Sequence, residues 1–294
     1  MSDAQTAVLM TGATGRVGTA VIDAGIADGW RLLDRRGHPD LEVIQAAITD
    51  MDAMTAAMEG VESVVHLAAA SAVDAPWSEV LQSNIVGMRQ VMRAARAAEV
   101  RSVVFASSNH VVGSAETELP TAEGAPPPEC MIDHRADIRP DSLYAVSKAF
   151  GEALLRYSVE NHRYPVHGYA IRFGSVRDPW YDHPFGDAER GVHRGRWDRD
   201  DEAYRQAHAR MHAIWQSRRD AAAIIEACLA DTSVTYDIFY GVSDNATRWL
   251  DINHAREVIG YTPRDSADTW GAPPAGGVRR VTETVWNGSR PPQS

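Results

Sequence analysis

Three glycines that follow a short apolar run constrain the fold of this chain more than any other feature. Residues 7–11 are the apolar run, and Gly12, Gly15 and Gly18 punctuate TGATGRVGTAVIDAGI before an apolar periodicity typical of a helix begins. A glycine turn between a strand and a helix lets the backbone approach a pyrophosphate at the helix N-terminus. A tight turn without a ligand is the alternative interpretation, because a glycine triplet alone is a weak signal.

A second apolar run carries the next candidate for nucleotide recognition. Residues 30–33 end in Asp34, which lies at the right distance downstream of the glycines to accept hydrogen bonds from the adenosine ribose hydroxyls. An aspartate at this position repels a 2′-phosphate, whereas Arg35 and Arg36, which follow at once, could tolerate one. We therefore expect NAD rather than NADP and leave dual use open. If Asp34 is only a solvated residue at a strand end, this cofactor preference has no support.

Strands and helices alternate through the first half of the sequence. Further strands are predicted by four apolar runs, 41–48, 61–67, 102–106 and 166–172. Helical segments separate them, and this alternation predicts the α/β class with a doubly wound parallel sheet that binds its ligand at the carboxyl ends of the strands.

We expect residues 1–172 to form the core that binds the cofactor and residues 173–270 to form a smaller substrate-binding region. Residues 271–294 are expected to be a flexible tail or a segment used in assembly.

Small and polar side chains follow the predicted strands. Asp50 comes after the third strand, where an adenine would lie, and small residues follow the fourth strand at Ala68 and Ala69. The alanines could let a ligand lie against the backbone or could simply pack between helices. After the fifth strand come four consecutive polar residues, Ser107, Ser108, Asn109 and His110. A serine hydroxyl there can donate to a developing carbonyl or alkoxide.

The stretch 141–155, DSLYAVSKAFGEALL, places a phenol and an ammonium on one helical face. Tyr144 and Lys148 stand at i and i+4, which are neighbours on a helix surface. A phenol has a pKa of about 10, and a nearby positive charge favours the phenolate. Such a pair can remove a proton from an alcohol, although an ordinary exposed Tyr and Lys would share the same spacing. Because Tyr144 fills the role of base, we expect local hydrogen bonds to satisfy His110.

Composition excludes several classes of protein. The chain has 294 residues, an apolar fraction of 44%, a charged fraction of 23% and a net charge of -11, so nothing favours nucleic acid as a partner. Cys130 and Cys228 lie far apart, which argues against a disulfide framework. No apolar window is long enough to span a bilayer, and the N-terminus lacks a signal pattern. We expect a cytoplasmic protein without a membrane segment.

The region after residue 176 is rich in charged side chains. Arg210, on a helix predicted at 201–217, could hold an anionic substrate group, because a guanidinium forks onto a carboxylate or phosphate. An arginine on a solvated face is the alternative. His208 and His212 are spaced for chelation, but no third ligand is evident, so we expect no metal.

Taken together, the motifs TGATGRVG, HLAA, SNIVG and YAVSK resemble those of extended short-chain dehydrogenases/reductases, and the resemblance covers residues 8–268. More narrowly, FASSNHVVG, SLYAVSKAFGE, IRFGSV and GVSDN resemble the uronate dehydrogenases and their relatives, the NAD-dependent glucose-6-phosphate dehydrogenases of haloarchaea. The resemblance implies a Rossmann-type sheet with a small C-terminal substrate-binding lobe, and oxidation of the anomeric carbon of a hexopyranose to a lactone with NAD.

The resemblance also implies roles for particular residues. Tyr144 is expected to be the base, Lys148 its electrostatic partner and Ser108 the donor that orients the alcohol. Sugar contacts are expected from Ser71, Ser108, Asn109, His110, Ser175 and Arg210, with Arg210 at the anionic C6 group. Cofactor contacts are expected from Gly12, Gly15, Arg16, Val17, Gly18, Asp34, Asp50, Leu67, Ala68, Ala69, Tyr144 and Lys148.

Two departures from the family concern the substrate. The connection between Ser108 and Tyr144 is longer than in typical uronate dehydrogenases, and the Arg-rich segment 177–205 looks inserted. We expect a homo-oligomeric NAD-dependent 1-dehydrogenase of a hexose with an anionic C6 group, most simply a uronate. A hexose 6-phosphate or 6-sulfonate such as sulfoquinovose is the alternative substrate. A nucleotide-sugar epimerase or dehydratase and a non-catalytic NAD-sensing module are the alternative functions.

Overall fold

A single parallel sheet organises the computed structural model, which describes residues 8–116, 118–119 and 130–274. The sheet has seven strands in the order β3-β2-β1-β4-β5-β6-β7. The strands are β1 (Val8–Thr11), β2 (Arg31–Asp34), β3 (Val43–Gln45), β4 (Ser63–His66), β5 (Ser102–Ser108), β6 (His167–Phe173) and β7 (Tyr236–Gly241). Every strand pair is parallel. From β1 the chain adds β2 and β3 on one side of the sheet and β4 to β7 on the other, so the predicted doubly wound sheet is confirmed.

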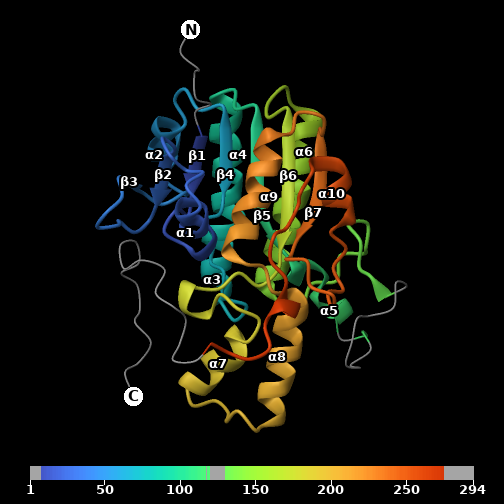
Figure 1. Ribbon diagram of the computed structural model, residues 1–294. Coiled ribbons are helices and arrows are strands. Elements are labelled where there is room, and N and C mark those ends of the chain that lie inside the picture. The colour runs from blue at the N-terminus through green and yellow to red at the C-terminus, as the bar shows by residue number, and fades with distance from the viewer. Residues whose placement is uncertain (1–7, 117, 120–129, 275–294) are drawn as a thin grey trace.

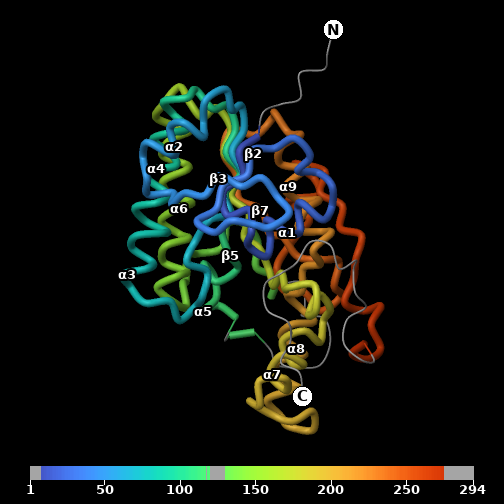
Figure 2. Tube along the Cα trace, turned by 90° about the vertical axis from the view of Figure 1, so that its left-hand side faces the viewer, coloured from blue at the N-terminus to red at the C-terminus, as the bar shows by residue number. Residues whose placement is uncertain are grey.

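Helices cover both faces of the sheet (Figure 2). The longer segments are α1 (Arg16–Asp23), α2 (Met51–Ala57), α4 (Gly87–Ala97), α6 (Leu143–Asn161), α9 (Arg218–Ala230) and α10 (Asn253–Ile259). One core lies between the sheet and α1, α9 and α10, and the other lies between the sheet and α2, α4 and α6. The central strands are buried on both faces, which explains their continuous apolar runs.

Shorter segments connect these helices to the carboxyl ends of the strands. They are α3 (Trp77–Glu79), the π-helix η1 (Val80–Val86), the 3-10 turn η2 (Asn109–Val112) and α5 (Gly113–Glu116). A protruding lobe lies below this edge of the sheet (Figure 1). It is built from the turn η4 (Pro179–Tyr181) and the helices α7 (Gly186–His193) and α8 (Glu202–Ile214), while the turn η5 (Ala267–Thr269) packs against α8.

The lobe is smaller than the expected substrate-binding region 173–270. Within that range β7 joins the sheet, and α9 packs against α1 in the core. The protruding part comes mainly from the Arg-rich segment 177–205 and α8. The third strand is also shorter than predicted, at three residues, and most of the predicted tail, 275–294, lies outside the described residues.

The length and apolar character of the described helices decide whether any of them could cross a bilayer. In residues 8–116, 118–119 and 130–274, none is both long enough and apolar enough to cross a membrane.

Candidate active site

The glycine turn after β1 depends on close backbone contacts. Gly12 has φ of 75°, and a Cβ on it would lie 2.6 Å from the backbone nitrogen of Ala68. A Cβ on Gly18 would lie 2.4 Å from the carbonyl oxygen of Ala13, whereas one on Gly15 would meet only the Gly12 carbonyl, at 3.1 Å. The first and third glycines are therefore required for packing, and Gly15 leaves the N-terminus of α1 open for an anion.

Asp34 ends β2 beside this turn and is buried. Its carboxylate accepts hydrogen bonds from the backbone nitrogens of Thr14 at 3.0 Å and Arg36 at 3.1 Å. These bonds fix the carboxylate at the edge of the glycine turn and leave it acceptor capacity for ribose hydroxyls. The Arg36 guanidinium, one of the two that could tolerate a 2′-phosphate, lies 4.0 Å from the same carboxylate and is 67% exposed.

Asp50 has a structural role that the sequence analysis did not assign. It is the N-cap of α2, where its Oδ1 accepts hydrogen bonds from the backbone nitrogens of Asp52 and Ala53, both at 3.1 Å. N-capping satisfies orphan donors of the first helical turn. Any contact with an adenine would have to use the remaining carboxylate oxygen.

Tyr144, Lys148 and Ser108 come together between α6 and β5, and all three are buried. Ser142 caps α6 by accepting a hydrogen bond from the backbone nitrogen of Ala145 at 3.2 Å, which sets the face that points to β5. Lys148 donates from Nζ to the carbonyl oxygen of Ala106 at 2.6 Å, and Nζ lies 5.6 Å from the centre of the Tyr144 ring. The predicted shared face is therefore present.

Burial dominates the electrostatics of this trio. It raises the pKa of Tyr144, while hydrogen bonding to Ser108 acts in the opposite direction. It also lowers the pKa of Lys148 to about 7, against a smaller raising effect from Glu152. The expected picture of a permanent ammonium that lowers the phenol pKa is too simple, because desolvation penalises both charged forms at once.

Asn84, the asparagine of the motif SNIVG, is a supporting residue for which the sequence predicted no role. It lies in the π-helix η1, a rare form of helix often found at functional sites. Its Nδ2 donates to the Ser147 hydroxyl at 2.8 Å, and Ser147 donates in turn to the carbonyl oxygen of Tyr144 at 2.6 Å. Asn84 also accepts from the backbone nitrogen of Ala70 at 2.8 Å. It therefore joins the loop after β4 to the helix that carries the phenol.

A buried ion pair lies one turn further along α6. Glu152 and Arg172 pair at 2.8 Å, with side chains 3% and 1% exposed. Ser107 donates to Glu152 at 2.5 Å, and Arg172 donates to the Tyr240 hydroxyl at 3.0 Å. This network joins α6 to β5, β6 and β7 directly behind the catalytic groups. Sequence reasoning missed it because its members come from four separate elements.

A cavity of about 540 Å³ opens beside the trio. Its lining residues are His110, Gly113, Ser114, Glu116, Asp141 and Arg210. The His110 Nδ1 lies 2.6 Å from the Asp141 carboxylate, so the expected local hydrogen bond of His110 is present. The His110 ring lies 6.1 Å from the Tyr144 ring, which places the cavity next to the phenol. A small alcohol in this cavity would lie close to the candidate base.

Arg210 lies in the cavity but already has a partner. Its guanidinium forms a bidentate ion pair with Glu116 of α5, with Nη2 at 2.9 Å from Oε2. The sequence analysis missed Glu116, because it stands 94 residues from Arg210 and no motif marks it. An anionic substrate group that meets Arg210 has to compete with this carboxylate.

A second arginine, Arg177, interacts electrostatically with Arg210. Arg177 pairs with Asp187 of α7, and its Nε is buried without a hydrogen-bond partner among the described residues. Burial lowers the pKa of Arg177, and the charges of Arg16 and Arg210 add to this lowering. Arg16, at the start of α1, pairs with Asp178 at 3.1 Å. The Arg-rich segment 177–205 therefore contributes a basic group near Arg16 of the glycine turn and Arg210 of the cavity.

The remaining predicted substrate residues are more dispersed. Asn109 is buried in η2, and Ser175 is buried after β6, where its backbone nitrogen donates to the Ile214 carbonyl at 2.7 Å. Ser71 is exposed in the loop after β4. Of the predicted sugar contacts, His110 and Arg210 line the cavity.

The fold and the buried phenol and lysine beside a glycine turn are those of a nicotinamide-dependent oxidoreductase. Residues 8–176 match the NAD dependent epimerase/dehydratase family. The chain belongs to this family.

Individual relatives are similar over most of the chain. The NAD-dependent glucose-6-phosphate dehydrogenase of Haloferax volcanii is 38% identical over 271 residues, which cover 88% of this chain and 94% of that protein. The uronate dehydrogenase of Pseudomonas putida is 32% identical over 272 residues, with 90% and 86% covered. A crystal structure of a mutant uronate dehydrogenase from Agrobacterium tumefaciens complexed with NAD matches with a TM-score of 0.67, 28% identity and coverage of 90% and 86%.

These comparisons bear on the predictions from the sequence. The resemblance to extended short-chain dehydrogenases, and within them to uronate dehydrogenases, is confirmed. The prediction of an NAD-dependent enzyme similar to sugar dehydrogenases is also confirmed, as is NAD as the cofactor.

Proposed function

We propose that this chain oxidises the anomeric carbon of a hexose that carries an anionic group at C6, with a uronate as the first candidate. The observation that carries the proposal is the placement of a buried Tyr144 and Lys148 beside a cavity that contains Arg210. Its relatives include uronate dehydrogenases, and those proteins supply the substrate class. The glycine turn, Asp34 and the loop after β4 are the proposed cofactor contacts.

In the proposed chemistry Tyr144 takes the proton of the anomeric hydroxyl. Ser108, hydrogen-bonded to that phenol, orients the sugar oxygen, and Lys148 stabilises the phenolate. NAD, when bound, supplies the acceptor for the hydride that leaves C1. The sugar loses one proton to the Tyr144 phenolate, which becomes the neutral phenol, and one hydride to the cofactor, so C1 becomes the carbonyl carbon of a lactone.

Arg210 is the proposed partner of the C6 anion. The bidentate geometry that it presents to Glu116 is the geometry that a carboxylate or phosphate would use. Binding would exchange one carboxylate for another anion and would leave Glu116 free to accept from a sugar hydroxyl. The affinity for an acidic sugar therefore depends on the difference in free energy between the ion pair of Arg210 with the sugar and its ion pair with Glu116. This dependence favours discrimination between substrates by charge and shape.

A hexose 6-phosphate is the second candidate substrate. The specific observation in its favour is Arg177, whose buried Nε has no partner and whose charge interacts with that of Arg210. A dianionic group is better matched than a carboxylate to two neighbouring guanidinium groups. The similarity to a glucose-6-phosphate dehydrogenase agrees with this alternative.

The test is NADH absorbance with NAD and a panel of glucuronate, galacturonate, glucose 6-phosphate, sulfoquinovose and glucose. We expect stoichiometric NADH and lactone with one acidic sugar and little turnover with glucose. NADH formation also separates this function from an epimerase or a non-catalytic sensor, which would not reduce added NAD in step with product. If NAD binds but every sugar is inert, the proposed substrate class is wrong.

A further inference from the structure

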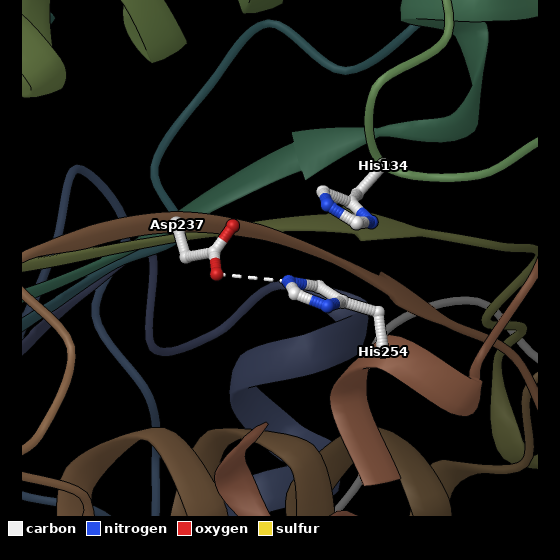
Figure 3. A group of neighbouring side chains, drawn as sticks. All are labelled: His134, Asp237 and His254. Atoms are coloured by element: carbon white, nitrogen blue, oxygen red, sulfur yellow. Dashed lines mark hydrogen bonds and ion pairs between the residues drawn. The ribbon is translucent and has the colours of Figure 1, made fainter. Parts of the chain in front are cut away.

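Three side chains that could bind a metal converge at the start of the edge strand, away from the carboxyl ends where the active site lies. They are His134 from the segment 130–136, Asp237 on β7 and His254 on α10 (Figure 3). Their ligand atoms all lie within 4.8 Å of one another, and all three side chains are half-buried. This cluster takes no part in the chemistry described above.

The contacts inside the cluster are close. His254 Nε2 lies 2.8 Å from an Asp237 carboxylate oxygen. The rings of His134 and His254 stack with centroids 3.5 Å apart and planes 12° apart, and Phe239 stacks on His254 at 5.3 Å. The surroundings therefore hold the His254 imidazole on two sides and orient it toward the carboxylate.

One polar atom of the cluster has no partner. The Nδ1 of His134 is buried and makes no hydrogen bond to any residue that the structure describes. An unpaired buried nitrogen costs free energy, so such an atom calls for a ligand or a specific role.

We propose that His134, Asp237 and His254 form a binding site for a divalent transition metal of the zinc type. Two imidazoles and one carboxylate are ligands that zinc, cobalt and nickel accept, whereas calcium and magnesium prefer oxygen alone. Three protein ligands leave a fourth position for water. Coordination at about 2.0–2.2 Å requires the cluster to contract and one ring to turn out of the stack, which the soft χ2 torsion of histidine permits.

A metal at this position would join three separate parts of the chain. The segment that carries His134 is already attached nearby, since the Ile132 backbone nitrogen donates to the Trp249 carbonyl at 2.7 Å and its carbonyl accepts from Asp251 at 3.0 Å. Binding would add a link from this segment to β7 and α10. The expected role is stabilisation, since the ligands lie outside the active site.

The other histidine pair in the chain provides a contrast. His208 and His212 have the i and i+4 spacing of a chelating pair. The His208 ring stacks on Phe185 at 4.0 Å, and His212 Nδ1 lies 2.9 Å from the Thr247 hydroxyl. In the part of the chain that the structure describes, the cluster at His134 is the one group of three potential ligands.

The experiment uses the full-length chain without a histidine tag, stripped with EDTA and dialysed. Zn²⁺ is titrated by calorimetry, and Co²⁺ is titrated by visible absorbance, because its d–d bands report the geometry. We expect one equivalent to bind and the melting temperature to rise with Zn²⁺. Asp237→Asn and His254→Gln are each expected to weaken binding by about tenfold or more.

Two further variants make the test decisive. His162→Gln changes a histidine at the end of α6 that is half-buried, like the three proposed ligands, and is expected to leave the affinity unchanged. His134→Gln, in a connecting segment, removes one ligand without altering β7 or α10. A wild-type chain that binds neither metal would overturn the proposal. So would binding that survives in all three ligand variants, provided that their melting curves show a folded protein.

Discussion

The two sides of the candidate active site differ in the state of their charged groups. We call the side of the sheet, with Tyr144 and Lys148, the catalytic wall, and the side of the lobe, with Arg210 and Arg177, the lobe wall. On the side of the sheet, burial raises the pKa of Tyr144 and lowers the pKa of Lys148 to about 7. On the side of the lobe, Arg210 is paired with Glu116 and Arg177 with Asp187. On the catalytic wall burial disfavours the charged forms of the side chains, whereas on the lobe wall carboxylates balance the charges of the arginines.

This difference separates two tasks of an enzyme. In the proposed function, packing and the hydrogen bond from Lys148 to the Ala106 carbonyl hold the groups of the catalytic wall, so proton transfer needs no exchange of ion-pair partners. If Arg210 binds the anionic substrate group as proposed, a carboxylate has to be displaced on the lobe wall, so we expect its ion pairs to affect selectivity rather than rate. Changes on the first wall should therefore act on kcat, and changes on the second should act on KM.

The largest effect is expected from Tyr144→Phe. Loss of a general base costs about 10²–10⁴-fold in rate, so turnover should fall by that factor while NAD affinity stays the same. Steady-state NADH formation and calorimetric NAD binding measure the two quantities. Wild-type turnover in this variant would show that the Tyr144 phenol is not the base. It would also contradict the role proposed for the catalytic wall.

The next largest effect concerns the ion pair behind the catalytic wall. Glu152→Gln leaves Arg172 buried without its charge partner, which should lower the free energy of unfolding by about 3–5 kcal/mol. Glu160→Gln is the matched control, because it breaks an exposed pair with Arg156 and should cost less than about 1 kcal/mol. Urea denaturation measures both. Equal losses would show that burial does not distinguish the two pairs.

The suppressed charge of Lys148 predicts a dependence of stability on pH. The folded chain releases this proton near pH 7, whereas an unfolded lysine keeps it to about pH 10.4, so the unfolded state binds more protons in between. Stability should therefore rise with pH above about 7, by up to about 1.4 kcal/mol per unit from this group. Urea denaturation of the wild type and of Lys148→Met at pH 7 and pH 9 isolates the contribution. If the stability of the wild type and of Lys148→Met changed equally between pH 7 and pH 9, the predicted contribution of Lys148 would be contradicted.

The lobe wall should respond through substrate affinity. Glu116→Gln removes the competing charge and should lower KM for acidic sugars about tenfold, whereas Arg210→Ala should raise it by a similar factor. Glu118→Gln is the matched control, since it breaks the exposed pair with Arg139. Initial rates with an acidic sugar and with glucose measure the effect. A KM that changes equally for both sugars would place the anion site elsewhere.

The sequence alone determined the features that depend on local geometry. The alternation of apolar runs predicted the parallel sheet, and the i and i+4 spacing placed Tyr144 and Lys148 on one face of α6, because helix and strand periods are fixed by the backbone. The glycine turn could also be predicted from the sequence, because only a residue without a side chain can approach Ala68 as closely as Gly12 does.

Only the tertiary structure decided which distant residues meet. Glu116 reaches Arg210 across 94 residues, and His134 lies against His254 from a different part of the chain. No local period records such contacts, because they depend on how connecting segments pack after the sheet forms. Burial likewise decided the pKa of Lys148, since a desolvation penalty exists only once the surrounding side chains are in place.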